Sequence, residues 1–102
     1  MSAANQFVSQ LIRAANGVNS VDATEQQRLL NGSVVTIRDM QEQARSANGT
    51  AIRKTITDLQ DLIVAAHLGR ATGEQLHAGL LAAACLIREL HISIDRQYPG
   101  RH

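Results

Sequence analysis

The chain has 102 residues, 44% of them hydrophobic, and a formal net charge of +1 with an isoelectric point near 8.0. This length corresponds to a single domain, residues 1–102, and the hydrophobic content is typical of a globular protein rather than a disordered one. The near-neutral charge gives no strong electrostatic field for nucleic acid or an anionic membrane. Aromatic residues make up only 2%, so we expect a core of aliphatic side chains.

Cysteine content and hydropathy exclude further classes of protein. Cys85 is the only cysteine, which rules out an internal disulfide and a zinc site built on paired cysteines. The N-terminal segment lacks the basic start and long apolar run of a signal peptide. The longest apolar run, Gly79–Ile87, is far shorter than the ~20 residues that a membrane span needs. We therefore expect a soluble cytoplasmic protein, and the abundance of Arg and Ala favours a GC-rich bacterial or phage origin.

The first predicted helix runs from about Ala3 to Asn16. Ser2 is a candidate N-terminal cap, and Gly17 is a candidate for the left-handed stop position. Three- and four-residue steps place one apolar face on this helix. Its members are Phe7, Val8, Leu11, Ile12 and Ala15.

The second predicted helix is long and ends near Ala47. Asp22 or Thr24 can cap its start. Gly32 interrupts the pattern, but the apolar residues keep their phase across it, so we predict one continuous helix at a cost of ~1 kcal/mol for the interior glycine. The apolar face consists of Leu29, Leu30, Val34, Ile37, Met40, Ala44 and Ala47.

The third predicted helix runs from Ala51 to about Leu68. Gly49 ends the preceding helix, and Thr50 caps this one. Its apolar seam is regular, and Leu62 lies on the shoulder of that seam. The seam contains Ile52, Ile56, Leu59, Ile63 and Ala66.

A tight connection around Gly69 leads to the fourth predicted helix, Glu74 to Arg96. Thr72 and Gln75 have the spacing of a capping box, and Pro99 with Gly100 ends the pattern. No segment alternates with period two for long enough to form a strand. The sequence therefore predicts an all-α fold: an antiparallel bundle of three main helices, with the short N-terminal helix packed across one flank.

The fourth helix has apolar residues on two opposite sides, whereas a surface helix needs only one apolar stripe. One side forms the core seam: Leu76, Leu80, Ala83, Ile87, Leu90 and Ile94. The other side carries Ala78, Leu81, Cys85 and Ile92. Two interpretations remain open for this second stripe. Either the first helix covers Leu81 and Cys85 within the monomer, or the stripe binds a second copy or another protein.

The polar residues give few chemical signals. His67 and His77 flank the Gly69 turn and, with Glu74, form a weak candidate metal site. The favoured interpretation is that these are ordinary solvated histidines. We therefore expect no metal and no cofactor. His91 and Asp95 are four residues apart and can pair on the helix surface.

Two carboxylates lie opposite the core seam of the third helix. Asp58 and Asp61 are expected to be solvated, with Lys54 as the partner of Asp58. Acid–base catalysis would require a cleft that shifts their pKa values, which the sequence does not indicate.

A basic corner is predicted near the start of the third helix. Arg53 and Lys54 lie in its first turn, and Arg45 can approach them across the connection. Free amide groups and basic side chains together could hold an anion, either a nucleic-acid phosphate or an acidic patch on a protein.

No phosphate-binding loop, catalytic triad or dinucleotide fingerprint is present. The sequence therefore predicts a small non-enzymatic protein that binds another protein as an inhibitor, adaptor or regulatory subunit, and that self-associates through Ala78, Leu81, Cys85 and Ile92. The alternative is a nucleic-acid-associated accessory protein that uses the Arg45, Arg53 and Lys54 corner.

Overall fold

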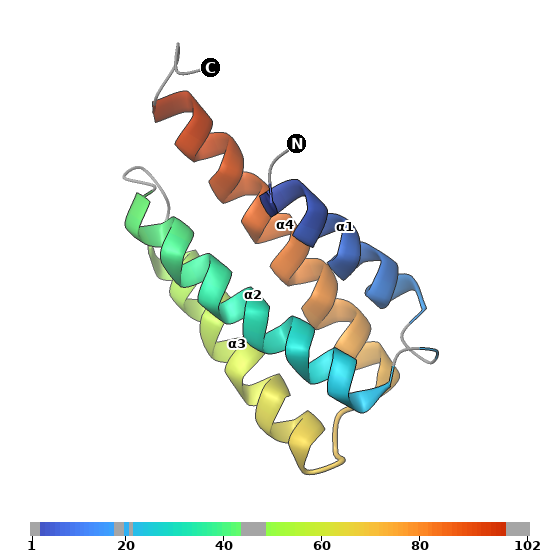
Figure 1. The fold of residues 1–102 in the computed structure, drawn as a ribbon. Helices are drawn as coiled ribbons and strands as arrows, with labels where there is room; N and C mark the ends of the chain where they lie inside the picture. Colours follow the sequence, from blue (N-terminus) through green and yellow to red (C-terminus); the bar gives the residue numbers. More distant parts are fainter. Residues whose placement is uncertain (1–2, 18–19, 21, 44–48, 98–102) are drawn as a thin grey trace.

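The computed structural model describes residues 3–17, 20, 22–43 and 49–97. These residues form four helices and no strand, which confirms the predicted all-α bundle. Helices α2, α3 and α4 run up, down and up, and the shorter α1 lies along α4 (Figure 1). Their bounds are α1 Ala3–Asn16, α2 Ala23–Gln43, α3 Gly49–His67 and α4 Gly73–Gln97.

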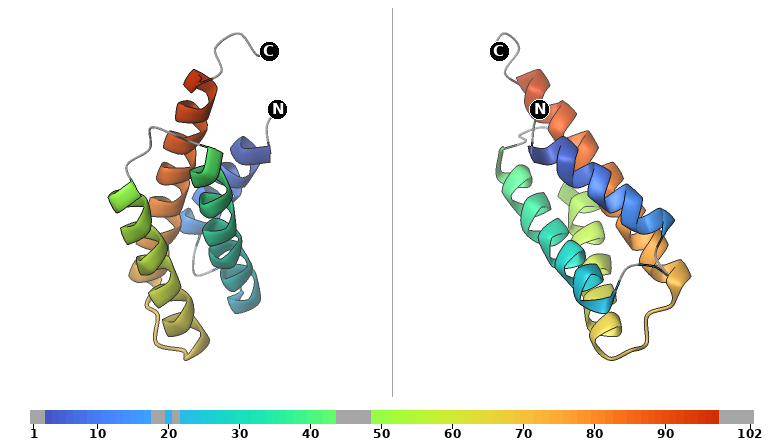
Figure 2. Two further views of the ribbon diagram at one scale, coloured as in Figure 1. Left: turned by 90° about the vertical axis from the view of Figure 1, so that its left-hand side faces the viewer. Right: turned by 45° about the vertical axis from the view of Figure 1, so that its right-hand side comes forward.

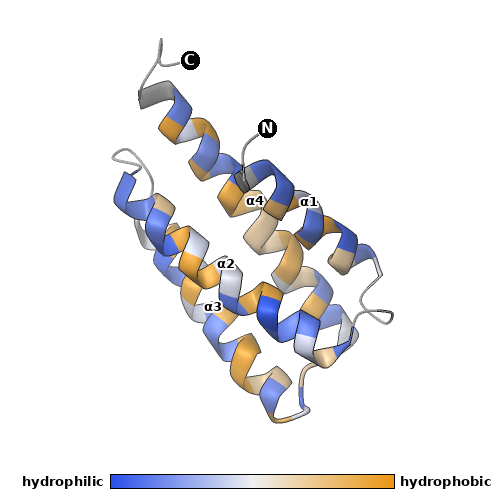
Figure 3. Cartoon of the chain, viewed as in Figure 1, coloured by the Kyte–Doolittle hydropathy of each residue, from blue (hydrophilic) through white to orange (hydrophobic). Residues whose placement is uncertain are grey.

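Helix α4 is the central element of an elongated molecule that measures 45 × 28 × 17 Å. It packs against all three other helices, most extensively against α1 and least extensively against α3 (Figure 2). Apolar residues line the sides on which the helices face one another, whereas polar residues dominate the outer sides of α1, α2 and α3 (Figure 3). The molecule therefore has one core, built around one side of α4.

The predicted seams account for most of this core. The α4 seam is buried from Leu76 to Leu90, and Ile94 at its end is half-buried. The α1 face is less uniform than predicted, because Ile12 is 37% exposed while Ala14 is buried instead. The buried apolar side chains of the other helices are Val8, Leu11 and Ala15 in α1, Leu29, Leu30, Val34, Ile37 and Met40 in α2, and Ile52, Ile56 and Leu59 in α3.

Helix α2 is continuous through Gly32, as predicted. A Cβ atom at this position would lie 3.2 Å from Cζ of Phe7, so the glycine gives the aromatic ring of α1 room to approach α2. The neighbouring Ser33 is fully buried, and its hydroxyl donates a 2.8 Å hydrogen bond to the carbonyl of Leu29. Both small residues serve close packing at this level of the bundle.

Local hydrogen bonds fix the helix starts. The Asp22 carboxylate accepts a 2.8 Å bond from the amide of Glu25, which selects Asp22 over Thr24 as the cap of α2. The Arg28 guanidinium hydrogen-bonds to Glu25 and holds the pKa of that carboxyl below its usual value. Thr72 and Gln75 exchange bonds of 3.0 and 3.1 Å, which confirms the predicted capping box of α4.

The end of α3 is the left-handed turn of this chain. Gly69 has φ +73°, and bonds from Gly69 to the Ala66 carbonyl and from Arg70 to the Ala65 carbonyl close a Schellman motif. The expectation that Gly17 takes the same conformation is wrong, because Gly69 alone has a positive φ among the described residues.

Two predicted helix boundaries differ or cannot be compared. Helix α3 begins at Gly49, so Thr50 lies inside its first turn rather than at the cap. Helix α2 is described to Gln43, and its predicted continuation to Ala47 lies outside the described residues. The predicted Ser2 cap and the Pro99–Gly100 stop lie outside them as well.

Candidate protein-binding surface

One side of α4 is left uncovered by the other helices. Its exposed residues recur at steps of three and four, so they share one side of the helix. Most of them are small or apolar, and Ile92 is 44% exposed. We call this set the outer face of α4: Ala78, Ala82, Cys85, Glu89 and Ile92.

Three of the four predicted self-association residues belong to this outer face. Ala78, Cys85 and Ile92 are exposed, whereas Leu81 is half-buried and packs against the core. The monomer therefore encloses Leu81 in part and leaves Cys85 open. The interpretation that the first helix covers both Leu81 and Cys85 is therefore wrong for Cys85, whereas binding of a second copy or another protein stays a prediction.

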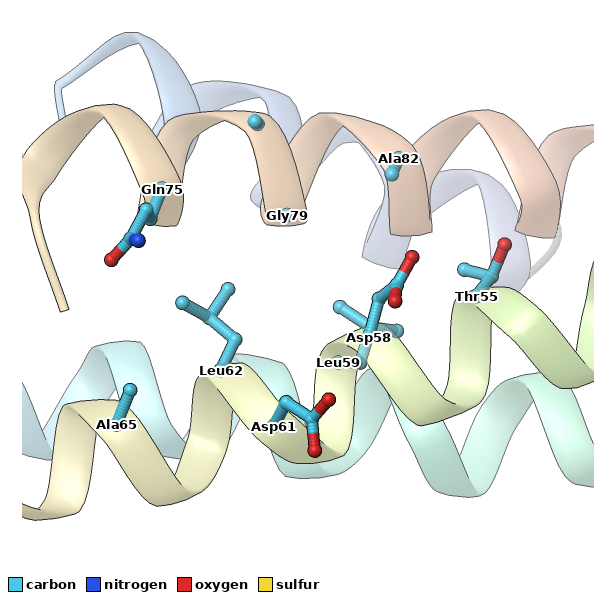
Figure 4. A pocket seen from close by; sticks show the side chains of 10 residues that line it. Thr55, Asp58, Leu59, Asp61, Leu62, Ala65, Gln75, Gly79 and Ala82 are labelled. Atoms are coloured by element: carbon cyan, nitrogen blue, oxygen red, sulfur yellow. The ribbon is translucent and has the colours of Figure 1, made fainter.

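A groove between α3 and α4 borders the outer face, with a volume of about 500 Å³. Small residues of α4 form one wall, and Leu62 of α3 points across the groove toward Gly79 (Figure 4). A Cβ atom at Gly79 would overlap the Leu62 side chain, so the glycine permits this approach. The groove is lined by Thr55, Asp58, Leu59, Asp61, Leu62 and Ala65 of α3 and by Gln75, Ala78, Gly79 and Ala82 of α4.

Two carboxylates form the acidic rim of this groove. Asp58 points toward Ala82 of α4, while Asp61 points away from the groove floor (Figure 4). Both are exposed, and neither makes an ion pair within the described part of the chain. The predicted pair between Lys54 and Asp58 is therefore not formed. The rim carries two exposed carboxylates over an apolar floor, and Lys54 lies one helical turn before Asp58 without an ion pair to it.

His77 has a structural partner that its sequence position did not indicate. Its Nδ1 atom lies 2.6 Å from the Ala15 carbonyl oxygen, so the ring nitrogen donates to the end of α1. This bond ties α1 to α4. His67 is exposed, and the described residues contain no group of three potential metal ligands, so the weak site with Glu74 is not assembled there. His91 and Asp95 pair at 3.5 Å, as predicted.

The basic corner is only partly described. Arg53 and Lys54 are exposed near the start of α3, and Arg45 lies outside the described residues. No anion-binding geometry can therefore be built from these three side chains. The nucleic-acid alternative gains no supporting observation from this corner.

One described helix, over Gly73–Asp95, is long and apolar enough to cross a membrane by length and composition. The run Gly79–Ile87 is shorter because it ends at the charged pair Arg88 and Glu89, whereas the criterion of length and composition admits two charged residues. Core helices of soluble proteins meet the same criterion. Since α4 packs against three helices, its core position accounts for much of this apolar content.

Comparisons of the chain with protein-family models, curated proteins and solved structures find no match. The functional argument therefore depends on the outer face of α4 and the adjoining groove. Sequence patterns indicated the outer face but missed the groove. One residue could have indicated the groove. Gly79 lies inside a strongly helical segment where no turn requires a glycine, so a packing reason for it is expected.

Proposed function

We propose that this protein acts without catalysis, by binding another protein as an inhibitor, adaptor or regulatory subunit, and that it self-associates. The observation that carries the proposal is the outer face of α4. Exposed Ala78, Ala82, Cys85 and Ile92 lie on a helix whose remaining sides pack against three neighbours. Glu89 separates Ile92 from the small residues of this face, and apolar surface that is left exposed beside polar residues is a feature of interaction sites.

The composition of the outer face supports helix-on-helix binding. Alanine and cysteine side chains are short, so a second helix can approach closely and pack along the ridge. Interface centres are depleted in charged residues, and between Ala78 and Ile92 this face carries one charge, Glu89, with exposed Glu74 one turn before Ala78 at its end. The small residues of the outer face therefore suit a partner that presents a helix better than a partner that presents a flat polar surface.

The polar groups favour binding over catalysis. Asp58 and Asp61 are the nearest approach to a catalytic pair, yet both are exposed. Acid–base catalysis by carboxylates depends on environments that drive two pKa values apart, such as burial of one of them. An exposed acidic rim is better suited to charge recognition.

Sedimentation velocity over a range of protein concentrations tests self-association. Leu81→Glu would mix unfolding with dissociation because Leu81 is half-buried, so we choose Cys85→Glu on the exposed outer face. Val35→Glu is the matched control, because Val35 is 59% exposed and lies on α2. We expect wild type and the control to dimerise and Cys85→Glu to remain monomeric.

Two results would contradict this proposal. A wild type that stays monomeric at about 100 μM has no dimer of micromolar affinity. Equal dissociation of Cys85→Glu and Val35→Glu would show that the outer face of α4 is not the contact.

A further inference from the structure

We propose that the groove between α3 and α4 binds a cationic amphipathic helix of a partner protein. Apolar side chains of that helix would enter the groove over Leu62 and Gly79, and its Lys or Arg residues would pair with Asp58 and Asp61. This inference rests on the proposed protein-binding function and names the chemistry of the partner.

The dimensions of the groove fit one face of a helix. Its α3 wall extends from Thr55 to Ala65, which is about 15 Å at the helical rise of 1.5 Å per residue. A volume of about 500 Å³ holds several side chains rather than a whole helix. Ala78, Gly79 and Ala82 form a low wall, so the partner backbone can approach α4 closely. This arrangement corresponds to recognition of an amphipathic helix by an apolar groove.

Helix α1 shows how α4 accepts a helix along its length. On the side of α4 that borders α2, α1 places its Phe7 ring over Gly32, and it is held by the His77 bond to Ala15. On the side that borders α3, no described helix occupies the corresponding position (Figure 2). Beside Gly79 the space is filled by Leu62 of α3, which forms the apolar floor of the groove. The occupant that we propose lies over this floor and comes from another protein.

Charge selects a cationic occupant. Among the ten residues that line the groove, Asp58 and Asp61 are acidic and none is basic. Opposite charges across an interface speed association and fix the register of a partner. The outer face of a second copy would bring Glu89 toward the same carboxylates, so a Lys- or Arg-bearing helix of another protein is the better occupant. Ala78 and Ala82 belong to both surfaces, so groove binding and self-association compete for them.

The test uses a synthetic amphipathic peptide of about 18 residues, long enough to form a helix, with Leu on one side and flanking Lys. Binding is measured by fluorescence anisotropy at about 150 mM salt, where exposed charges are screened beyond roughly 8 Å. Protein concentrations are kept in the range where sedimentation shows a monomer. A second peptide with Glu in place of Lys controls for apolar binding alone.

The charge part of the proposal is tested with a double variant, Asp58→Asn with Asp61→Asn. We expect it to weaken binding of the Lys peptide about three- to thirtyfold, the range that two surface charge pairs provide. The matched control is Asp39→Asn with Glu42→Gln, which removes two exposed acids from α2. We expect the control to bind within about twofold of wild type.

The steric part is tested with Ala82→Trp, which fills the groove without changing charge. Ala82 is exposed, so folding should persist, and far-UV circular dichroism of the variant confirms it. We expect loss of peptide binding, whereas Val35→Trp on α2 leaves binding intact.

Each contrary outcome overturns the inference. If both double variants weaken binding equally, the peptide responds to net charge and not to the groove. If the Glu peptide binds as well as the Lys peptide, the acidic rim has no selecting role. If wild type binds neither peptide, the groove is not a site for cationic helices, while the sedimentation result continues to decide self-association separately.

Discussion

Truncation of Leu11 tests whether α1 belongs to the cooperative core. Leu11 is fully inaccessible in α1, which packs more extensively against α4 than any other helix does. Leu→Ala changes in such sites cost about 2–5 kcal/mol, through lost burial and the cavity left behind. A chain of 102 residues has a free energy of unfolding of about 5–15 kcal/mol. Leu11→Ala is therefore expected to remove a large share of the stability.

The assay is urea unfolding followed by far-UV circular dichroism, with Ile12→Ala as the matched control. Ile12 is adjacent in sequence but 37% exposed, so its truncation should cost about 1 kcal/mol or less. We expect Leu11→Ala to lower the midpoint without changing the slope m, since α1 unfolds with the rest. Equal costs for the two variants would refute the docking of α1, and a reduced m would show that α1 separates first. In either case the α1-facing side of α4 would also be open to a partner.

Three further predictions concern single features of the fold. Thr72→Ala should lower the free energy of unfolding by about 1 kcal/mol, because it removes a capping-box bond of α4; an unchanged urea midpoint would contradict this. Gly32→Ala should raise the free energy of unfolding by up to about 1 kcal/mol and with it the melting temperature, because the end of the Phe7 ring needs to shift by only a few tenths of an ångström. A lower melting temperature would show that the ring cannot move. The exposed Cys85 thiol should react with a disulfide reagent in the native protein, and more slowly as protein concentration rises; a rate independent of concentration argues against an interface there.

Most of the helical seams and the capping box of α4 were predictable because their causes are local, whereas the predicted left-handed stop at Gly17 and the cap at Thr50 are wrong. The steps from Leu76 to Leu90 place the side chains on one face regardless of what covers them. The Thr72–Gln75 box needs only two residues at the right spacing. Continuity of the second helix through Gly32 was predictable for the same reason, because the apolar residues before and after the glycine fall on the same face of one helix.

Features that depend on tertiary packing were not predictable. Gly79 and Leu62 meet only because α3 and α4 lie side by side, and neither residue indicates the other in sequence. The Ile63 and Ala66 end of the α3 seam is half-buried rather than buried. Helix α3 packs least extensively against α4, so its periodicity overstates its burial. A pattern gives the direction in which a side chain points, but not whether a neighbouring helix extends far enough to cover it.

The unusual apolar content of α4 has two separate causes. Contacts with α1, α2 and α3 account for the core seam and for buried Ala84. These contacts do not account for Cys85 and Ile92, which remain exposed although hydration of apolar surface is unfavourable. Arg88 and Glu89 are also exposed, and both would be costly at the centre of a bilayer. The part of α4 that the fold leaves unexplained is therefore a row of small and apolar residues with charged residues beside it, a composition that matches the centre and rim of a protein interface.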